Sequence, residues 1–186
     1  MFSGFAELVA RLDAAVGAGG PEAVTTAVKH DLEGLLAAGW ALPARFRAAR
    51  SDCYARRLLH EDPAGRYTAV VMTWGPGQGT AVHDHGGLWC VEGVVEGEMR
   101  VTQYDVAPEP DGTYRVAPCG RPLRAGVGTA GRLIPPTDYH VLENALPDRP
   151  SITLHVYGGS LDHCRVFQPR PDGRFDETFR SLSYHE

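Results

Sequence analysis

The sequence predicts a mainly β fold, an antiparallel sandwich or barrel, with a small helical segment at its N-terminus. Two observations carry this prediction. Glycine and proline are frequent, with 22 and 14 copies among 186 residues, and most of them follow residue 62, where they separate short runs of other residues. Those runs are rich in β-branched and aromatic side chains, and many short strands between turns are typical of antiparallel sandwiches and barrels.

The first fifty residues are predicted to form a helical cap. Apolar side chains from Phe5 to Leu12 recur at helical spacing after Ser3, which suits the N-cap position. A second helix is predicted from Pro21, a favourable first-turn residue, to about Gly39. The segment has no residue pattern that indicates chemistry, so we expect it to pack against one side of a sheet.

Strands are predicted where β-branched and aromatic residues run between turn signals such as GPGQG, EGE, PDG and PDR. We interpret the chain as a single domain, residues 1–186, in which a cap of residues 1–50 precedes a β-barrel of residues 51–186. The six predicted strands are Tyr67–Trp74, Leu88–Val95, Glu98–Asp105, Arg132–Ile134, Ile152–Tyr157 and Cys164–Gln168.

Charge and apolar content argue against several classes of protein. The 18 basic and 23 acidic side chains give a net charge of −5, without the basic patch of a nucleic-acid binder. No apolar run approaches the roughly 20 residues that span a membrane, and Glu7, Arg11 and Asp13 interrupt any signal-peptide core. Four scattered cysteines without a CxxC pair predict reduced thiols. We therefore expect a cytoplasmic monomer with no nucleic-acid or membrane partner.

The densest chemical signal lies in one stretch, GQGTAVHDHGGLWCVEGVVEG. His83 and His85 are two residues apart, so on a strand their side chains project from the same face and can share a metal. Their spacing resembles the first motif of the cupin superfamily, G-x5-H-x-H-x4-E-x6-G. Gly77 and Gly97 fall in register with this motif, and Cys90 occupies the position of its glutamate.

The second cupin motif, P-x-G-x2-H-x3-N, is matched by Pro135, His140 and Asn144, with Thr137 in place of the glycine. Because both motifs occur in order, the chain is identified as a member of the cupin superfamily over roughly residues 65–160. The resemblance implies a cupin double-stranded β-helix, which is a jelly-roll barrel.

With Cys90 in the glutamate position, the site offers three neutral imidazoles, those of His83, His85 and His140. Imidazole suits iron, zinc, copper or nickel, and oxygen chemistry favours iron. Such a site leaves the whole charge of a dication to the substrate, so an anionic ligand such as a thiolate should bind well. Glu92 shares the strand face of Cys90 and is an alternative carboxylate ligand, two residues out of register.

Four stretches resemble the thiol dioxygenases, and within them the cysteine dioxygenase family: YARRLL at 54–59, HDHGGLWC at 83–90, YHVLEN at 139–144 and TLHVYGGSLDHC at 153–164. The first fifty residues carry no recognisable family motif. The resemblance implies that three histidines hold Fe(2+) and that L-cysteine binds the iron through its sulfur and amine. Dioxygen then converts the thiol to a sulfinic acid. The expected protein is therefore an iron-dependent thiol dioxygenase acting in cysteine catabolism.

The resemblance assigns Arg56 to the substrate carboxylate. A guanidinium fork suits that task because it pairs bidentately with a carboxylate. Tyr54, two residues earlier on the same strand face, is expected to add a hydroxyl contact. Arg57 should point the other way and have only a surface role.

Catalytic roles are implied for Tyr157, His155 and Cys90. In the family the tyrosine hydroxyl lies by the iron and the histidine hydrogen-bonds to it. Thr153 replaces the usual serine and keeps its hydroxyl, which leaves a Thr153–His155–Tyr157 relay open. Cys90 matches the cysteine that in some members forms a thioether bond with the tyrosine.

Three alternatives stay open. A relative that acts on 3-mercaptopropionate or another thiol acid would generally carry glutamine at the position of Arg56 and an arginine near Val166, and both positions here favour cysteine. The second alternative is a non-catalytic metal- or small-molecule-binding cupin, in which Tyr157 would have no role. A metal-dependent isomerase is the third. The remaining histidines are expected at structural or surface positions: His30, His60, His163 and His185.

Overall fold

Twelve strands follow two helices in residues 4–186, the part of the chain that the structure, a computed structural model, describes. The helices are α1 (Phe5–Ala15) and α2 (Pro21–Ala37), and a 3-10 turn, η1 (Ala44–Phe46), leads to the first strand. The strands are β1 (Ala55–Glu61), β2 (Thr68–Trp74), β3 (Val82–His83), β4 (Cys90–Glu96), β5 (Glu98–Pro108), β6 (Tyr114–Pro118), β7 (Leu123–Gly126), β8 (Ala130–Leu133), β9 (His140–Asn144), β10 (Ser151–Tyr157), β11 (His163–Pro169) and β12 (Phe175–Ser181).

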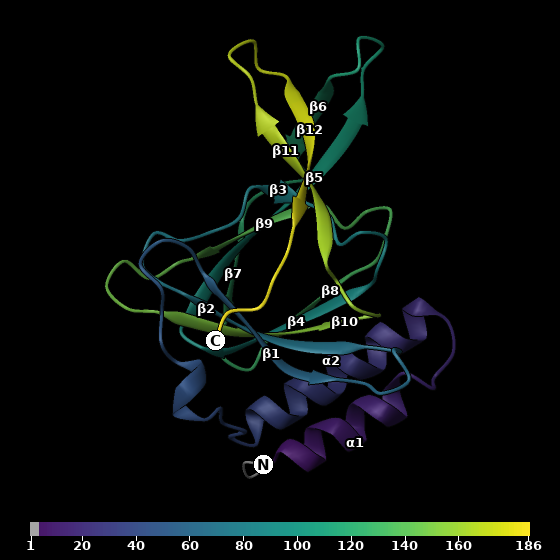
Figure 1. Cartoon of the computed structure of the whole chain (residues 1–186), viewed down its shortest axis with the longest axis vertical. Coiled ribbons are helices and arrows are strands. Elements are labelled where there is room, and N and C mark those ends of the chain that lie inside the picture. Colours follow the sequence, from purple (N-terminus) through teal and green to yellow (C-terminus); the bar gives the residue numbers. More distant parts are fainter. Residues whose placement is uncertain (1–3) are drawn as a thin grey trace.

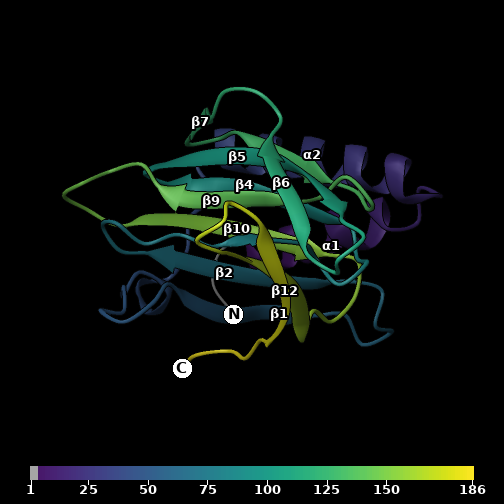
Figure 2. The ribbon, with the colours of Figure 1, turned by 90° about the horizontal axis from the view of Figure 1, so that it is seen from above.

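The strands form two antiparallel sheets (Figure 1). One has five strands in the order β1-β2-β10-β4-β8, and the other has seven in the order β6-β12-β11-β3-β9-β5-β7. The hairpins β5–β6 and β11–β12 extend as two arms at the top of Figure 1, and they stand in front of the barrel in Figure 2. The arms meet where β12 pairs with β6. The predicted mainly β, antiparallel fold with N-terminal helices is confirmed.

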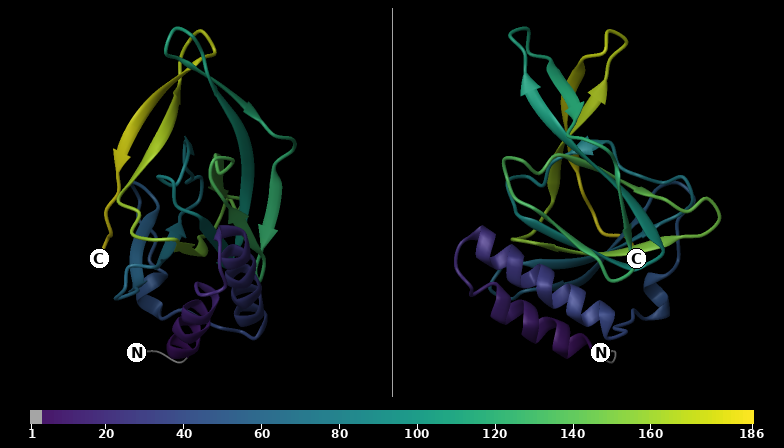
Figure 3. Two further views of the ribbon diagram at one scale, coloured as in Figure 1. Left: turned by 90° about the vertical axis from the view of Figure 1, so that its right-hand side faces the viewer. Right: turned by 180° about the vertical axis from the view of Figure 1, so that it is seen from behind.

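The helices cover the five-stranded sheet on the side away from the arms (Figure 3). Helix α2 packs on β4 and β8, with Val28 and Leu32 buried against Val91 of the sheet. A Cβ at Gly93 of β4 would lie 3.1 Å from Leu36 Cδ1, so the glycine lets the helix approach closely. The N-terminal segment therefore packs against one side of a sheet, as expected.

The helical cap is shorter than predicted. Helix α2 ends at Ala37, and residues 38–50 contain only the short turn η1. Gly39 has φ +81°, a left-handed conformation that ends helices, and Pro43 follows. The N-cap of α1 is Gly4, and Ser3, the predicted N-cap, lies outside the described residues. Within the described range, no helix has the length and apolar content needed to cross a membrane.

Six strands were not in the predicted set: β1, β3, β6, β7, β9 and β12. Strand β3 has two residues, and β12 is exposed along most of its length. Sequence patterns reveal a strand through its buried face, so a short or mostly exposed strand gives no signal. Strand β12 is defined instead by its seven-residue register with β11.

The core has two parts, one on each face of the five-stranded sheet. Strands β2 and β10 are buried along their whole length because the helices cover one face and the barrel interior the other. This is why both read as continuous apolar runs without alternation. The inner part includes Met72, Trp74 and Tyr157, and it borders the site described next.

Candidate active site

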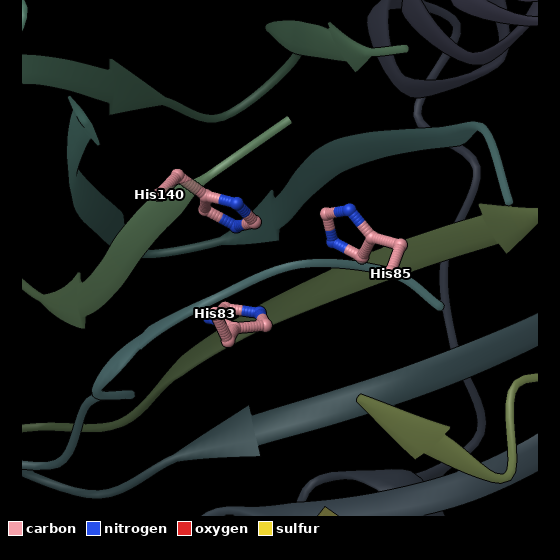
Figure 4. Close-up of side chains that lie close together, drawn as sticks. All are labelled: His83, His85 and His140. Carbon is pink, nitrogen blue, oxygen red and sulfur yellow. The ribbon is translucent and has the colours of Figure 1, made fainter. Parts of the chain in front are cut away.

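Three histidine side chains meet inside the barrel (Figure 4). His83 ends β3, His85 lies in the turn after it, and His140 begins β9; β3 and β9 pair at His83 and His140. One ring nitrogen of each lies within 4.8 Å of the other two. His85 and His140 are buried and His83 is half-buried. The fold thus brings together the three residues that the sequence analysis expected as metal ligands.

His85 reaches the site from a turn, so the expectation that it shares a strand face with His83 is wrong. Strand β3 ends at His83 because the chain turns there: the Asp84 carboxylate accepts the Gly86 N–H at 3.2 Å, and Gly86 has φ +58°. Asp84 also accepts the backbone N–H and the Nε–H of Arg165 on β11, at 2.8 and 2.7 Å. The turn that carries His85 is therefore tied to the sheet.

Each of the three rings has an oxygen acceptor at Nδ1. Ala81 O lies 3.1 Å from His83 Nδ1. Asp138 supplies the other two, its Oδ2 at 3.2 Å from His85 and its backbone O at 3.2 Å from His140. An acceptor at Nδ1 keeps the proton there, so the lone pair of each neutral ring is on Nε2. Asp138 was not predicted, and its only signal is its place two residues before His140.

The donor set fits a divalent metal. Burial lowers the pKa of His83 well below its usual value. Burial also lowers the pKa of His85, although the hydrogen bond that His85 donates to Asp138 acts to raise it. Imidazole nitrogens in a buried group of three suit iron, zinc, copper or nickel. Their Nδ1 acceptors provide the outer hydrogen bonds that orient histidine ligands.

A carboxylate lies beside these histidines. Glu92 on β4 is 8% exposed, and its Oε2 is 3.6 Å from His140 Nε2 and 3.5 Å from His155 Nδ1. Burial by itself would raise the pKa of Glu92, but the interactions with the two histidines have the larger effect and lower the pKa to about 2. Burial lowers the pKa of His140, and the Glu92 charge reverses this effect and raises it. Glu92 is therefore ionised.

A cavity of about 30 Å³ lies beside the histidines. It has room for roughly two water molecules. Apart from Cys90, all the predicted site residues line it. Its lining consists of Tyr54, Arg56, Met72, Trp74, Thr80, His83, His85, His140, Leu142, His155, Tyr157, Cys164 and Leu182.

Arg56 on β1 lines this cavity with only 3% of its surface exposed. Its Nη2 donates to Leu161 O at 2.8 Å, whereas its buried Nε has no hydrogen-bond partner in the described part of the chain. No ion pair joins Arg56 to a carboxylate among residues 4–186. A buried cation without a counter-charge is costly, so this position suits an anionic ligand. Tyr54 lies in the same cavity, with its ring stacked on Trp74 at 4.4 Å between centroids.

The C-terminal tail holds Arg56 in place, which the sequence analysis missed. His185 donates its N–H to Arg56 O at 2.7 Å, and Arg56 donates its own N–H to His185 Nδ1 at 3.0 Å. The Tyr184 ring lies 4.6 Å from Arg56 Cζ. His185 thus has a structural role, as expected. Its partner is 129 residues away along the chain, so no local pattern could indicate the contact.

The predicted surface role of Arg57 is wrong. Its side chain does point away from Arg56, but it is only 8% exposed. It donates to Ala48 O at 2.9 Å and to Thr73 Oγ1 at 3.5 Å. The segment that contains η1 covers this face of β1, and so Arg57 is buried beneath it.

His155 is held by a chain of hydrogen bonds. Trp74 Nε1 donates to Thr153 Oγ1 at 2.9 Å, and Thr153 Oγ1 lies 2.7 Å from His155 Nε2. Burial lowers the pKa of His155 to about 4, so the ring is neutral and accepts the threonine proton at Nε2. The first link of the expected relay is present. The second link, a hydrogen bond between His155 and Tyr157, does not occur in the described structure, where His155 Nδ1 has no hydrogen-bond partner. The two rings stack instead, with centroids 5.9 Å apart.

Cys90 and Tyr157 are direct neighbours across the pair β4–β10. Directly opposed residues of an antiparallel pair lie within about 4.5–5.5 Å between Cα atoms. Both are buried, and burial raises the pKa of each well above its usual value. At the end of this strand pair, Gly158 donates its N–H to Trp89 O at 2.9 Å. A Cβ added at Gly158 would lie 2.3 Å from Trp89 Nε1, so the indole lies directly against the glycine.

The two sheets and the histidine cluster define a cupin, the double-stranded β-helix. A crystal structure of an uncharacterized conserved protein with a double-stranded β-helix domain from Klebsiella pneumoniae matches with a TM-score of 0.50. The match has 20% identity and covers 66% of this chain and 85% of that chain. Within this class, the profile of the family Cysteine dioxygenase type I matches residues 25–170. The chain belongs to the cysteine dioxygenase type I family, and the predicted membership is confirmed.

Curated relatives agree with this family. Cysteine dioxygenase type 1 of Rattus norvegicus is 28% identical over 133 residues, which is 72% of this chain and 63% of the relative. The Homo sapiens protein is 27% identical over 131 residues, 70% of this chain and 62% of the relative. The chain thus matches less than two thirds of the length of these relatives. The family match begins inside α2, earlier than the motifs had indicated.

Proposed function

We propose that the protein is an iron-dependent thiol dioxygenase that converts L-cysteine and O2 to cysteine sulfinic acid. Overall, R–SH and O2 give R–SO2H, so both oxygen atoms end in the product. The observation that carries the proposal is the buried guanidinium of Arg56, which lines the same cavity as the three histidines and pairs with no carboxylate within residues 4–186. Membership of the cysteine dioxygenase type I family supports the reaction type.

His83, His85 and His140 are proposed to hold Fe(2+) through their Nε2 atoms. A bound ferrous ion supplies the activation of dioxygen, for which no amino-acid side chain is suited. The chain itself binds and orients the thiol and excludes water. The small volume of the cavity supports that role, since it leaves no room for bulk solvent.

Arg56 and Tyr54 are proposed to bind the substrate carboxylate from one side of the cavity, by a bidentate guanidinium contact and a hydroxyl contact. Tyr157 is proposed to place its hydroxyl beside the reacting sulfur. His155 acts as a positioning residue: Thr153 holds its Nε2, and its ring stacks on Tyr157.

A dioxygenase of 3-mercaptopropionate or another thiol acid is the alternative within the family. Arg165 is next to Val166, close to where that alternative expects an arginine. Its guanidinium is bound to Asp84 at 2.7 Å and to the Tyr139 hydroxyl at 2.8 Å, and it does not line the cavity. The free cation of the cavity is therefore Arg56, which favours cysteine.

Oxygen uptake by the iron-loaded protein with three thiols tests the proposal. Cysteine has an amine and a carboxylate, 3-mercaptopropionate lacks the amine, and cysteamine lacks the carboxylate. We expect the highest kcat/KM with cysteine, and cysteine sulfinic acid as the product. A higher kcat/KM with 3-mercaptopropionate would make that thiol acid the proposed substrate and leave the proposed reaction unchanged. No uptake by fully iron-loaded protein would favour a non-catalytic binding cupin.

A thioether between Cys90 and Tyr157 is expected in at least part of the protein after aerobic turnover. Their direct cross-strand pairing supports this. Dioxygen is the two-electron oxidant: the thiol loses one hydrogen, the ring loses one, and O2 is reduced to H2O2 as the sulfur–carbon bond forms. Peptide mass mapping should recover the two peptides joined and two hydrogen atoms lighter. Cys164→Ala, which removes another thiol beside the cavity, should leave the joined peptide unchanged. Recovery of both peptides only in unmodified form would refute the crosslink.

Tyr184→Ala is expected to raise KM for cysteine roughly two- to fivefold with little change in kcat. A cation–π contact at a partly exposed ring is worth about 0.5–1 kcal/mol, and its loss leaves Arg56 less well positioned. Steady-state oxygen uptake measures this. Phe179→Ala removes an aromatic ring that is 71% exposed on β12 and is the matched control. Equal KM values for the two variants would mean that the tail does not position Arg56.

We also propose that the protein works as a monomer in the cytoplasm. The four cysteines are free thiols, and a reducing compartment keeps thiols and a thiol substrate in that state. Light scattering of the iron-loaded protein checks the monomer, and a dimer mass would contradict it.

A further inference from the structure

Solvent reaches the three histidines from the side of His83. His83 is half-buried, whereas His85 and His140 are buried. A second cavity, of about 10 Å³, adjoins the first, because the two cavities share four lining residues: Tyr54, Thr80, His83 and Cys164. Neither His85 nor His140 lines the second cavity. This second cavity is therefore the mouth through which a small ligand approaches the three histidines.

Arg180 is the exposed residue of this mouth, and the other residues that line it are half-buried or buried. Strand β12 descends from its arm to the barrel (Figure 1), and there Arg180 pairs with Cys164 of β11. The Cys164 side chain is buried, and that of Tyr54 is half-buried. A ligand from solvent therefore meets the guanidinium before it meets the thiol, the tyrosine or the histidines.

The charge of Arg180 is not balanced by a carboxylate within residues 4–186. The two acidic side chains of β12 pair with other arginines: Asp176 with Arg170 at 3.0 Å and Glu177 with Arg165 at 3.6 Å. The Arg180 charge acts inside the mouth, because it opposes the rise that burial causes in the pKa of Tyr54 and of Cys164. The mouth thus carries a free positive charge on a chain whose net charge is −5.

We propose that Arg180 selects ligands by charge as they enter the cavity, so that small carboxylates, above all thiol carboxylates, are drawn in and cations are repelled. A fixed charge at the entrance of a cleft raises the encounter rate of oppositely charged ligands by roughly 10- to 1000-fold. Arg56 lies deeper, beside the histidines, so a carboxylate passes from one guanidinium to the next. The inference rests on the proposed function for the identity of the ligand, and Arg180 itself touches no reacting atom.

The three thiols of the oxygen-uptake experiment differ in net charge near pH 7. The charge is negative for 3-mercaptopropionate, zero for cysteine and positive for cysteamine. Arg180→Glu changes the charge of the mouth by two units, so it should raise kcat/KM for cysteamine relative to 3-mercaptopropionate at least about fivefold. The change should appear in KM rather than in kcat, because Arg180 does not line the cavity beside the histidines.

Alkylation of Cys164 tests the same selection without metal or turnover. The Cys164 thiolate displaces iodide from iodoacetate, an anion, or from iodoacetamide, which is neutral, and neither reagent is larger than cysteine. Both reagents react with the same thiolate, so the ratio of their rates reports the charge of the mouth. Arg180→Glu should lower the ratio of iodoacetate to iodoacetamide at least about fivefold, and Arg180→Lys should keep it. Added salt should bring the ratios of wild type and Arg180→Glu together.

Peptide mass mapping measures both rates at Cys164 separately from the other cysteines. Arg121→Glu is the matched control, since it makes the same charge change at an exposed arginine that lines neither cavity. It should keep the wild-type ratio at Cys164. An equal fall in Arg121→Glu would assign the effect to the charge of the whole chain and overturn the role of Arg180.

An unchanged ratio in Arg180→Glu would also overturn the inference. So would a Cys164 that neither reagent modifies while the exposed Cys119 reacts fully, because the mouth would then not lead to the cavity. Absence of oxygen uptake with every thiol would overturn the proposed function instead, and the alkylation ratio would still decide whether Arg180 selects by charge.

Discussion

His140→Ala is expected to remove most of the bound iron and to lower oxygen uptake with cysteine more than about 100-fold. Loss of a residue that only supports a ligand typically costs 10- to 100-fold in metal affinity or activity, and loss of a ligand should cost more. His140 also pairs across β3–β9 with His83, so its removal opens the group of three on one side. Iron content per chain and initial oxygen-uptake rates measure the two effects.

His30→Ala is the matched control, because His30 is an exposed histidine on α2, far from the barrel interior. It should retain the iron content and the rate of the wild type. Full iron occupancy in His140→Ala would contradict the assignment of His140 as a ligand. Retained iron with lost activity would also contradict this assignment, since His140 would then be needed for the reaction but not for iron binding.

Arg56→Ala is expected to raise KM for cysteine about 10- to 150-fold. The range corresponds to roughly 1.5–3 kcal/mol for a hydrogen bond to a charged group. Cysteamine has no carboxylate, so its KM should change little, and the preference for cysteine over cysteamine should narrow by the same factor. The ratio of the two kcat/KM values is the measurement, because it cancels any loss of active enzyme.

Arg57→Ala on the same strand is the control for this variant. Arg57 donates to Ala48 O and Thr73 Oγ1 on the other face of β1, so its loss should lower Tm and leave the cysteine-to-cysteamine ratio unchanged. An unchanged ratio in Arg56→Ala would mean that another group binds the carboxylate. A changed ratio in Arg57→Ala would mean that the ratio reports general damage to β1.

The sequence indicated features whose signal lies within a short stretch of chain. The helices were predicted from apolar residues at helical spacing, and the strands with a buried face from their β-branched and aromatic content. The two cupin motifs named His83, His85 and His140, and the fold brings their ring nitrogens within 4.8 Å of one another. The motifs predicted these three residues because each motif lies at a turn or strand end, where nearby residues determine the backbone geometry.

Tertiary structure decided the features that depend on distant contacts. Glu92 Oε2 lies 3.6 Å from His140 Nε2 because β4 and β9 face the same barrel interior. Arg57 is buried because the segment with η1 covers β1. Tyr184 holds Arg56 across more than half of the chain.

The sequence by itself determined the fold class, the family and the set of chemical groups, because repeating spacing and local turns encode them. Only the tertiary structure decided which groups meet and which stay without a partner. Burial and hydrogen bonding depend on neighbours that are remote in sequence, as for Oε2 of Glu92 and Nε of Arg56. No spacing in the sequence could reveal these unsatisfied buried atoms, because each depends on which distant residues surround it.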